Sequence, residues 1–588
     1  MVEKDEAGKG ALEFRGLVAA LCERRGVFSM NKQFESRLAV ALIFAILAVA
    51  VVFRFLWLET IPGLNGDEAW LGWKAAKAAS GAPLDWRTNS GNFTNPFFLL
   101  PLVWVHYFFE PSAWAVRIVA ALSGVLTLVA NFLLCRRIFN ETVAWASTIL
   151  VAVMPMAIAY SRFGWEPSQI PLFAVFIFYS AMAICDSSRP LLHWMLVACL
   201  SLFCGFLVHP TMAFLGLFIA LGLIARWFQP ERTRVRATLL FVSGILISVL
   251  LGFAMYLKAP PWIQPEIAAR FHAWAWVSDM PRFFVAWLRN FNGINTFGFI
   301  PGSEPRASQI LNIGKPWELF QVDWIVGGIF FASIGVLVFG LYRNFRSVQN
   351  GSVFQRQVVV LLFAFTLGTL LFGIMNGTCK VAVWFDRYAL WSLIPGCMIL
   401  GLAYSACVCH LKSNFFPLRW AGITFCLFML LFFYQKYFMH FKKCGGDAGM
   451  DSRVAATQIK KTAAELLTDW QLSQAPSSKP VLISSDWFAF WPIAYYMQRK
   501  HAAHSWEMVY AGAEAPEQLR GMHKFRERFA DRKVVVAEFD GVDAWEKWKE
   551  VFPEKSWDEN AFVLRDIAGR PNLRLDFPVS DAERAGAL

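Results

Sequence analysis

The 588-residue chain has little charge for its length. Asp, Glu, Lys and Arg make up 17% of it and hydrophobic residues 57%, whereas about a quarter of a soluble globular protein is charged. The apolar residues are concentrated in blocks of roughly 20, long enough to cross a bilayer. Basic residues cluster in the short connections between these blocks, as orientation signals do, so the net charge of +12 does not imply a nucleic-acid partner. The composition predicts an α-helical multi-pass membrane protein.

Signatures of several other protein classes are missing. The 11 cysteines form no CxxC pair, and most lie inside apolar blocks, as small buried hydrophobic residues do. The sequence contains no internal repeat and no low-complexity tract. Residues 1–37 have mixed charge and lack a signal-peptide pattern, so we expect a cytoplasmic tail before an uncleaved first span.

Eleven apolar segments are candidate spanning helices: 38–58, 115–135, 142–160, 168–185, 191–208, 211–228, 237–257, 321–342, 357–375, 388–409 and 417–438. If the N-terminus is cytoplasmic, the basic connections between these segments all lie on the cytoplasmic side of the membrane. This holds provided that residues 96–109 do not cross the membrane. That segment is short for a span, and we expect a helix along the outer interface. The predicted location is the inner (cytoplasmic) membrane, with a cytoplasmic N-terminus.

The chain divides into three predicted parts. Residues 1–37 are the tail, and residues 38–439 form a transmembrane catalytic domain with outer loops at 59–113 and 258–320. In residues 440–588, amphipathic stretches such as 454–467 alternate with the β-rich runs 481–483 and 534–537. This pattern predicts a small extracytoplasmic, or periplasmic, α/β domain. It contains no Gly-rich phosphate loop and no metal-ligand spacing.

An acidic pair, Asp67-Glu68, follows the first predicted span. Adjacent carboxylates beside a hydrophobic span are costly and rarely needed for folding, so we expect them to act in proton abstraction, metal binding or phosphate chemistry. The topology places further ionisable residues on the same outer face, where they are a functional-site hypothesis: Arg162, Glu166, His209, Lys380, Asp386 and Arg387. The structural alternative for the cations is that they reach toward lipid headgroups.

This set of residues suits sugar transfer from a lipid-phosphate carrier. Such a reaction needs a carboxylate to deprotonate the acceptor, and cations or a metal to neutralise the leaving phosphate. We assign Asp67 as the base with Glu68 beside it. The residues predicted to bind the donor phosphate are Arg162, Lys380, Arg387 and Tyr388, and those predicted to line the acceptor or sugar site are Trp70 and Asn95.

A divalent metal is a further possibility at this face. Glu166 could share a metal with Asp67 or Glu68, and oxygen ligands suit Mg²⁺ or Mn²⁺. His209 would shift the preference toward Zn²⁺, although a simply solvated or hydrogen-bonded histidine before Pro210 is the alternative.

The order of motifs resembles a known family. After the first apolar helix come Gly66-Asp67-Glu68-Ala69, Thr94-Asn95-Pro96, Ala115-Val116-Arg117-Ile118, Tyr160-Ser161-Arg162-Phe163-Gly164 and, late in the chain, Asp386-Arg387-Tyr388. This order is similar to that of the GT-C membrane glycosyltransferases, in the branch of dolichyl-phosphate-mannose–protein mannosyltransferases and bacterial aminoarabinose transferases. The resemblance implies inverting transfer from a polyprenyl-phosphate-linked sugar, with Asp67 as base, and a glycan, lipid or protein as acceptor.

Two motifs differ from the aminoarabinose branch. Those enzymes have Arg-Tyr soon after the acidic pair and Glu-Lys-Pro further on, where this chain has Ala69-Trp70 and Thr94-Asn95-Pro96. Glu166 also lies one position closer to Arg162 than the resemblance predicts. These differences point away from transfer of aminoarabinose to lipid A and leave the donor sugar and acceptor open.

Two other classes of function remain as alternatives. A transporter or flippase would use the charged outer face as a vestibule, but it should carry ionisable residues near mid-span and interrupted helices in matched halves. A membrane scaffold would use the α/β domain to bind partners, and it leaves Asp67-Glu68 unexplained.

Overall fold

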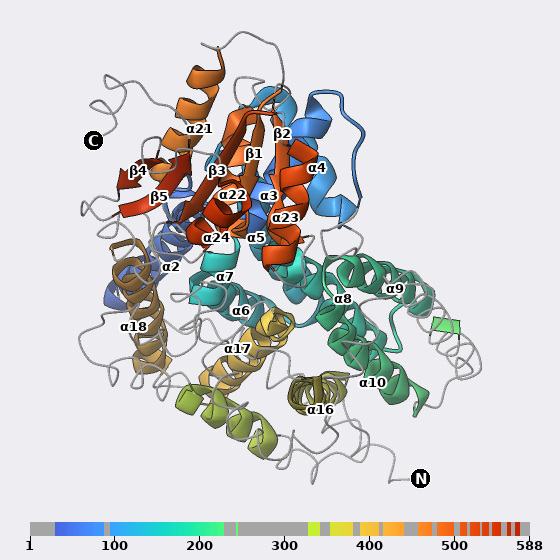
Figure 1. Cartoon of the computed structure of the whole chain (residues 1–588). Coiled ribbons are helices and arrows are strands. Elements are labelled where there is room, and N and C mark those ends of the chain that lie inside the picture. The colour runs from blue at the N-terminus through green and yellow to red at the C-terminus, as the bar shows by residue number, and fades with distance from the viewer. Residues whose placement is uncertain are drawn as a thin grey trace, which may run out of the picture.

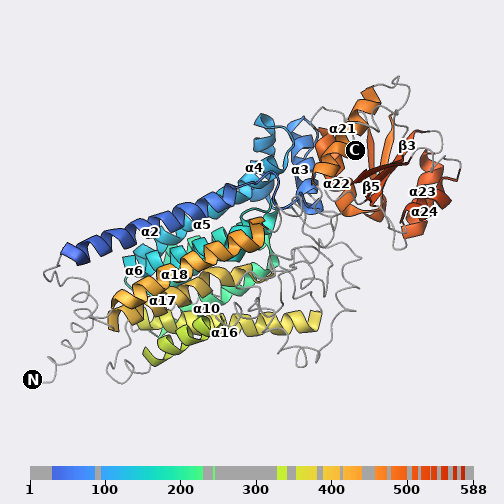
Figure 2. The ribbon, with the colours of Figure 1, turned by 90° about the vertical axis from the view of Figure 1, so that its left-hand side faces the viewer.

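The protein folds as a bundle of long apolar helices with a small α/β unit at one end. The computed structural model describes residues 30–86, 94–228, 243–244, 327–340, 353–379, 388–410, 415–439, 457–472, 479–498, 506–513, 518–529, 532–539, 544–553, 561–565 and 571–576. In Figure 2, α2 (Met30–Phe55), α5 (Ala113–Ile138) and α17 (Leu393–His410) run in similar directions. Helices α3 (Gly66–Ala79) and α4 (Pro96–Phe108) lie with the C-terminal sheet at one end of this bundle.

The other helices of the bundle have the following bounds: α6 Glu141–Val153, α7 Pro155–Tyr160, η1 Glu166–Gln169, α8 Ile170–Ile184, α9 Leu191–Val208, η2 Pro210–Leu215, α10 Gly216–Trp227, α16 Val353–Cys379, η5 Leu390–Ser392, α18 Phe415–Phe433 and the π-helical η6 Tyr434–Met439. An unlabelled apolar helix covers Gly327–Gly340. Within the described ranges, eight helical segments are long and apolar enough to cross a membrane. All eight coincide with predicted spans, so the protein is a multi-pass membrane protein.

One predicted span is broken. The segment 142–160 was expected as a single helix, but α6 ends at Val153 and α7 begins at Pro155. Proline has no N–H to continue the helical hydrogen bonds, and it disfavours a helical conformation in the residue before it. Met154 is accordingly extended, with φ −62° and ψ 125°. The predicted span 237–257 lies outside the described residues apart from positions 243–244, and of 321–342 only 327–340 is described.

Helix α4 has the character of an interfacial helix. Its 13 residues are too few to cross the roughly 30 Å hydrocarbon core at about 1.5 Å per residue. One face, with Phe98, Leu99 and Leu102, is buried, whereas Trp104 and Phe108 are both 66% exposed on the other. A buried inner face and an exposed aromatic outer face suit the membrane boundary, where Trp is enriched. Its orientation in the bilayer stays a prediction.

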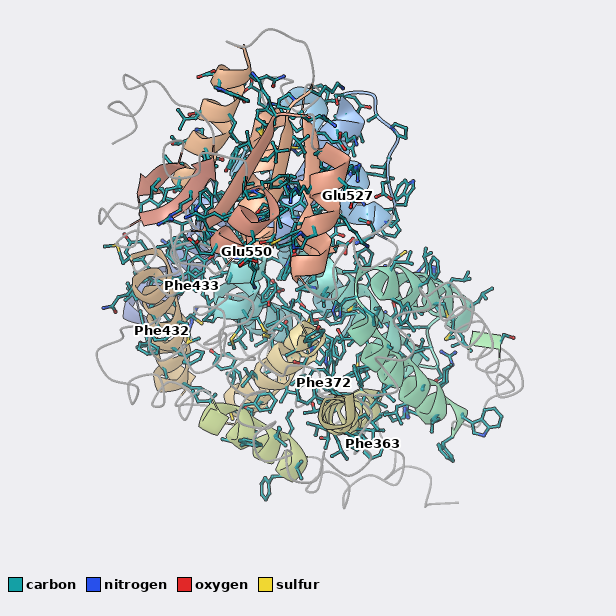
Figure 3. All side chains as sticks on the ribbon, in the orientation of Figure 1. Phe363, Phe372, Phe432, Phe433, Glu527 and Glu550 are labelled. Carbon is teal, nitrogen blue, oxygen red and sulfur yellow. The ribbon has the colours of Figure 1, made fainter. Side chains whose placement is uncertain are left out.

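Helices on the rim of the bundle expose large apolar side chains on one face and bury them on the other. Figure 3 shows Phe372 on the side of α16 toward α17, with Phe363 pointing away. The exposed fraction is 3% for Phe372 and 57% for Phe363. The Phe372 ring lies 5.5 Å from that of Phe214 and 6.2 Å from that of Trp391. A side chain such as Phe363 is accommodated by lipid, not by water.

The C-terminal part is an α/β unit, as the sequence predicts. Its elements are α21 Thr457–Leu472, β1 Val481–Ser484, α22 Trp487–Met497, β2 Glu507–Tyr510, η9 Ala511–Ala513, α23 Gln518–Phe529, β3 Val534–Phe539, α24 Ala544–Val551, β4 Ala561–Arg565 and β5 Pro571–Asp576. The strand order is β2-β1-β3-β5-β4; β1 is parallel to β2 and β3, and β5 is antiparallel to β3 and β4. The β-rich runs at 481–483 and 534–537 are therefore neighbouring central strands.

Alternation along the strands separates two apolar layers. Val481 and Ile483 of β1 contribute to one buried cluster together with Trp548 of α24. Leu482 points to the opposite face and joins the main core, which contains α22. Successive side chains of a strand point to opposite faces, so the sheet has helices on both sides. Figure 1 shows α22 behind the sheet and α23 and α24 in front of it.

A buried carboxyl group joins β3 to the turn after β1. Glu538 Oε1 accepts hydrogen bonds from the Ser485 amide (2.5 Å), the Ser485 hydroxyl (2.7 Å) and the Trp548 indole N–H (2.9 Å). Burial raises the pKa of Glu538 to about 7, and these hydrogen bonds only partly offset that effect. Folding therefore favours the protonated form of this side chain.

The stability of the α/β unit is expected to fall as pH rises. A carboxyl group with a raised pKa contributes stability that is complete below its unfolded pKa of about 4.3 and is lost as pH rises through about 7. The loss is on the order of 3 kcal/mol at most. Thermal unfolding of the detergent-solubilised full-length protein at pH 5 and pH 8 measures it. Glu538→Gln should remove this component, and an equal pH dependence in both proteins would contradict it.

Candidate active site

The acidic pair lies in the first turn of α3. Asn65 is the N-cap: its side-chain oxygen accepts a hydrogen bond from the Asp67 amide at 2.8 Å. Glu68 accepts one from the Asn65 amide at 3.0 Å, which completes a capping box. Carboxylates in the first turn are also favoured by the helix dipole. The pair therefore contributes to folding, contrary to the expectation that it is rarely needed there.

Glu68 is fully buried and points toward α5. Its two oxygens accept hydrogen bonds from Arg117 Nε at 2.8 Å and Nη2 at 2.7 Å, a two-point ion pair. The Gly164 amide donates to the same carboxylate at 2.6 Å. Arg117 also donates to the carbonyls of Leu58, Pro62 and Gly63. These contacts give Glu68 a structural role that joins α3, α5 and the chain before η1.

Asp67 points in a different direction and is partly exposed. Adjacent residues of a helix do not share a face, so Asp67 is free of the Glu68–Arg117 contact. Its Oδ1 accepts a hydrogen bond of 2.9 Å from the indole N–H of Trp487, the first residue of α22. Its carboxylate also interacts electrostatically with that of Glu166. Of the two carboxylates, Asp67 is the one that solvent reaches.

Lys74 is a cation on the same side of α3. It lies seven residues, or about two turns, after Asp67, so the two share a face. Lys74 is buried and forms an ion pair of 3.1 Å with Asp85. Its ammonium group lies 4.3 Å from the centre of the Trp70 ring. It also interacts electrostatically with the Glu166 carboxylate. Burial lowers its pKa, and Asp85 and Glu166 oppose that shift. Asp67, Glu166 and Lys74 therefore form one charged cluster.

Glu166 and Asn95 connect α4 to the start of α8. Glu166 Oε1 accepts a hydrogen bond of 2.6 Å from the Asn95 amide. The Asn95 side chain accepts from the Phe97 amide as the N-cap of α4, and it donates to Gln169 at 2.9 Å. Asn95 is fully buried and Trp70 is 6% exposed. The predicted sugar- or acceptor-lining role of these two residues remains a prediction, and their described contacts are structural.

Arg162 is also fully buried. It donates to the carbonyls of Phe53 (2.6 Å) and Ile61 (2.7 Å), and its guanidinium lies 4.7 Å from the centre of the Phe438 ring. Binding a phosphate would require it to give up these carbonyl contacts. The geometry therefore favours a role in holding the end of α2, and the donor-phosphate role stays a prediction without support from these contacts.

His209 and Tyr388 lie together at the ends of α9 and η5. Their ring centres are 5.2 Å apart, and His209 Nδ1 is 2.8 Å from the Thr211 hydroxyl. Lys380, Asp386 and Arg387 fall outside the described residues. Across the described ranges, no group of three or more His, Cys, Asp or Glu could hold a metal ion. The predicted metal role of Glu166 and His209 stays a prediction.

Two residues of this site were missed from the sequence. Lys74 could have been found, because the 67/70/74 spacing places it on the Asp67 face of a helix. Trp487 could not, because it follows Asp67 by 420 positions and no local pattern connects them.

The Glu68–Arg117 pair predicts a specific stability defect. Arg117→Met leaves a buried carboxylate without its cation and should cost about 3–5 kcal/mol. The double variant Glu68→Gln/Arg117→Met should recover part of that loss, because no buried charge remains. Thermal unfolding in detergent, with the amount of monodisperse protein, measures both. A single variant as stable as wild type would contradict the structural role.

Comparison with known proteins agrees with the fold. Residues 95–257 match the family model described as dolichyl-phosphate-mannose-protein mannosyltransferase. The crystal structure of ArnT from Cupriavidus metallidurans in the apo state superposes with a TM-score of 0.51 at 14% identity, covering 92% of this chain and 98% of ArnT. The same protein bound to undecaprenyl phosphate gives a TM-score of 0.50 with equal identity and coverage. No curated protein matches significantly. The chain therefore shares the overall fold of ArnT, and residues 95–257 resemble the mannosyltransferase family.

Proposed function

We propose that the protein transfers a sugar from a polyprenyl-phosphate-linked donor to an acceptor at the outer face of the membrane. The observation that carries this proposal is the cluster of Asp67, Glu166 and Lys74, which combines a partly exposed carboxylate with a buried cation. The likeness to a fold that binds undecaprenyl phosphate in ArnT supports the class of donor. Placement in the inner membrane, with the cluster and the α/β unit outside, belongs to the same proposal.

Each part of the cluster has a role in an inverting displacement. Asp67 takes the proton of the acceptor nucleophile as that atom attacks the anomeric carbon. The bond from this carbon to the phosphate oxygen breaks, and the polyprenyl phosphate leaves with the electron pair. The ammonium group of Lys74 offsets the charge that develops on the phosphate. Lys380 and Arg387, on the chain before Tyr388, are predicted to assist.

Glu166 tunes this arrangement without taking part in bond making. Its carboxylate is anchored by the Asn95 amide and faces both Asp67 and Lys74 through the electrostatic interactions described above. Burial raises the pKa of Glu166 to about 7, and in its ionised form Glu166 favours the ammonium form of Lys74. Glu166 therefore supports the cation of the cluster.

Asp67→Asn should abolish transfer and preserve the fold. The amide keeps the shape and can still accept from Trp487, but it cannot take a proton. We expect a loss of at least about 10²-fold, within the range for general-base catalysis. The masses of envelope glycans from cells that express either protein, compared with cells lacking it, provide the measurement. Glu110→Gln, an exposed carboxylate in the same outer loop, is the control, and wild-type glycans with Asp67→Asn would overturn the base assignment.

Lys74→Gln should chiefly weaken the donor interaction. Loss of one charged contact to phosphate corresponds to roughly a tenfold increase in the KM for the polyprenyl-phosphate sugar. Lys74→Arg keeps the charge and should retain most of the affinity. Steady-state kinetics with purified enzyme and varied donor concentration tests this, and an unchanged donor KM in Lys74→Gln would remove Lys74 from the phosphate site.

A further inference from the structure

The C-terminal α/β unit reaches the acidic pair through a single helix. At the start of α22, the Trp487 indole N–H donates a hydrogen bond to Asp67. Toward its other end, Tyr495 contacts Ser112 at the start of α5. The Tyr495 hydroxyl accepts from the Ser112 amide at 2.8 Å, donates to the Ser112 carbonyl at 3.0 Å and lies 2.9 Å from His106 Nε2. The two anchors are eight residues apart, or about 12 Å along the helix.

Two glycines of α3 make this close approach possible. A Cβ on Gly66 would lie 2.4 Å from Trp487 Cδ1, 2.8 Å from its Nε1 and 3.0 Å from its backbone oxygen. A Cβ on Gly72 would lie 2.8 Å from a ring carbon of Tyr495 and 2.6 Å from the Val116 side chain. Any side chain at these positions would force α22 away from α3. The glycine of the Gly66-Asp67-Glu68 motif is therefore the position that lets the indole reach the neighbouring carboxylate.

Contacts within the α/β unit fix the position of the Trp487 indole. Asp486 caps α22 by accepting from the Phe488 and Ala489 amides at 2.7 and 3.1 Å. The preceding residue, Ser485, is fixed by Glu538 of β3. The Trp487 ring packs at 5.5 Å from Trp491 and 5.3 Å from Tyr510. These contacts fix the orientation of the donor N–H.

We infer that Trp487 is a positioning residue for Asp67, supplied to the active site by the C-terminal unit, an inference that rests on the proposed function. A rigid N–H donor on Oδ1 restricts the orientations that the carboxylate can take. A base held within hydrogen-bond reach of the nucleophile transfers a proton faster than one that samples several rotamers. The C-terminal unit is thus part of the catalytic centre and not a separate binding module.

Trp487→Phe tests this because it keeps the ring and removes only the N–H. We expect kcat to fall about tenfold, the fold-change for losing one hydrogen bond to a charged group, with little change in the KM values for either substrate. Trp506→Phe is the matched control. It removes a buried indole N–H from the same α/β unit, its ring packs on Trp470, and within the described part of the chain the N–H has no hydrogen-bond partner. Its kcat should equal that of wild type.

Gly66→Ala provides a second, independent variant. The added methyl group displaces the indole from Asp67 without altering Trp487, so it should lower kcat by a similar factor. Because both changes remove one interaction, the double variant Gly66→Ala/Trp487→Phe should be no slower than the slower single variant. A multiplicative effect would mean that the two residues act separately. Monodispersity in detergent confirms that each variant is folded.

The outcomes separate this inference from the proposed function. If Asp67→Asn is inactive and Trp487→Phe has the kcat of wild type, the positioning role is wrong and the base assignment stands. If Asp67→Asn retains wild-type activity, the proposed function fails first, whatever Trp487→Phe does. A change confined to KM in Trp487→Phe would make the indole a substrate-binding group and would equally overturn the inference.

Discussion

The ion pair between Glu68 and Arg117 is the interaction on which the end of the helical bundle nearest the α/β unit depends. It is fully buried, and Arg117 also reaches three carbonyls of the chain between α2 and α3. A buried charge of this kind is tolerated only when its partner and hydrogen bonds are complete. The ion pair fixes where α3 begins, and so it fixes the direction in which Asp67 points. Glu68 is thus used for architecture, whereas Asp67 stays partly exposed.

A similar division applies to the other polar residues near the site. Asn95 caps α4, and Arg162 holds the end of α2 through two carbonyls. Polar groups buried at this boundary need hydrogen-bond partners within the protein. Lipid tails offer none, so an unpaired polar group would destabilise the fold. Most of the conspicuous charges of the outer loops are therefore occupied by structure. The charged cluster of Asp67, Glu166 and Lys74 differs because its members also interact electrostatically across the site, beyond their contacts to Trp487, Asn95 and Asp85.

The sequence predicts the architecture well and the site only in part. Spans such as 191–208 were located because apolar blocks of bilayer length are an unambiguous pattern, and the strands at 481 and 534 because β-branched runs are. The break at Met154–Pro155 was missed because hydropathy does not register a proline inside an apolar block. The structural contacts of Glu68 and Arg162 were missed for another reason. A sequence shows that a charge lies near a membrane face, but not whether it turns inward to a carbonyl. The contact between Asp67 and Trp487 depends on a tertiary interface that no local pattern encodes.

The distance along the chain between Asp67 and Trp487 has a consequence for biosynthesis. The carboxylate is inserted with the first transmembrane helix, whereas its indole partner is synthesised after the described helices of the bundle have emerged. During that interval Asp67 is without the Trp487 indole. Under the proposed function, sugar transfer would begin only when the C-terminal unit has folded and docked against α3.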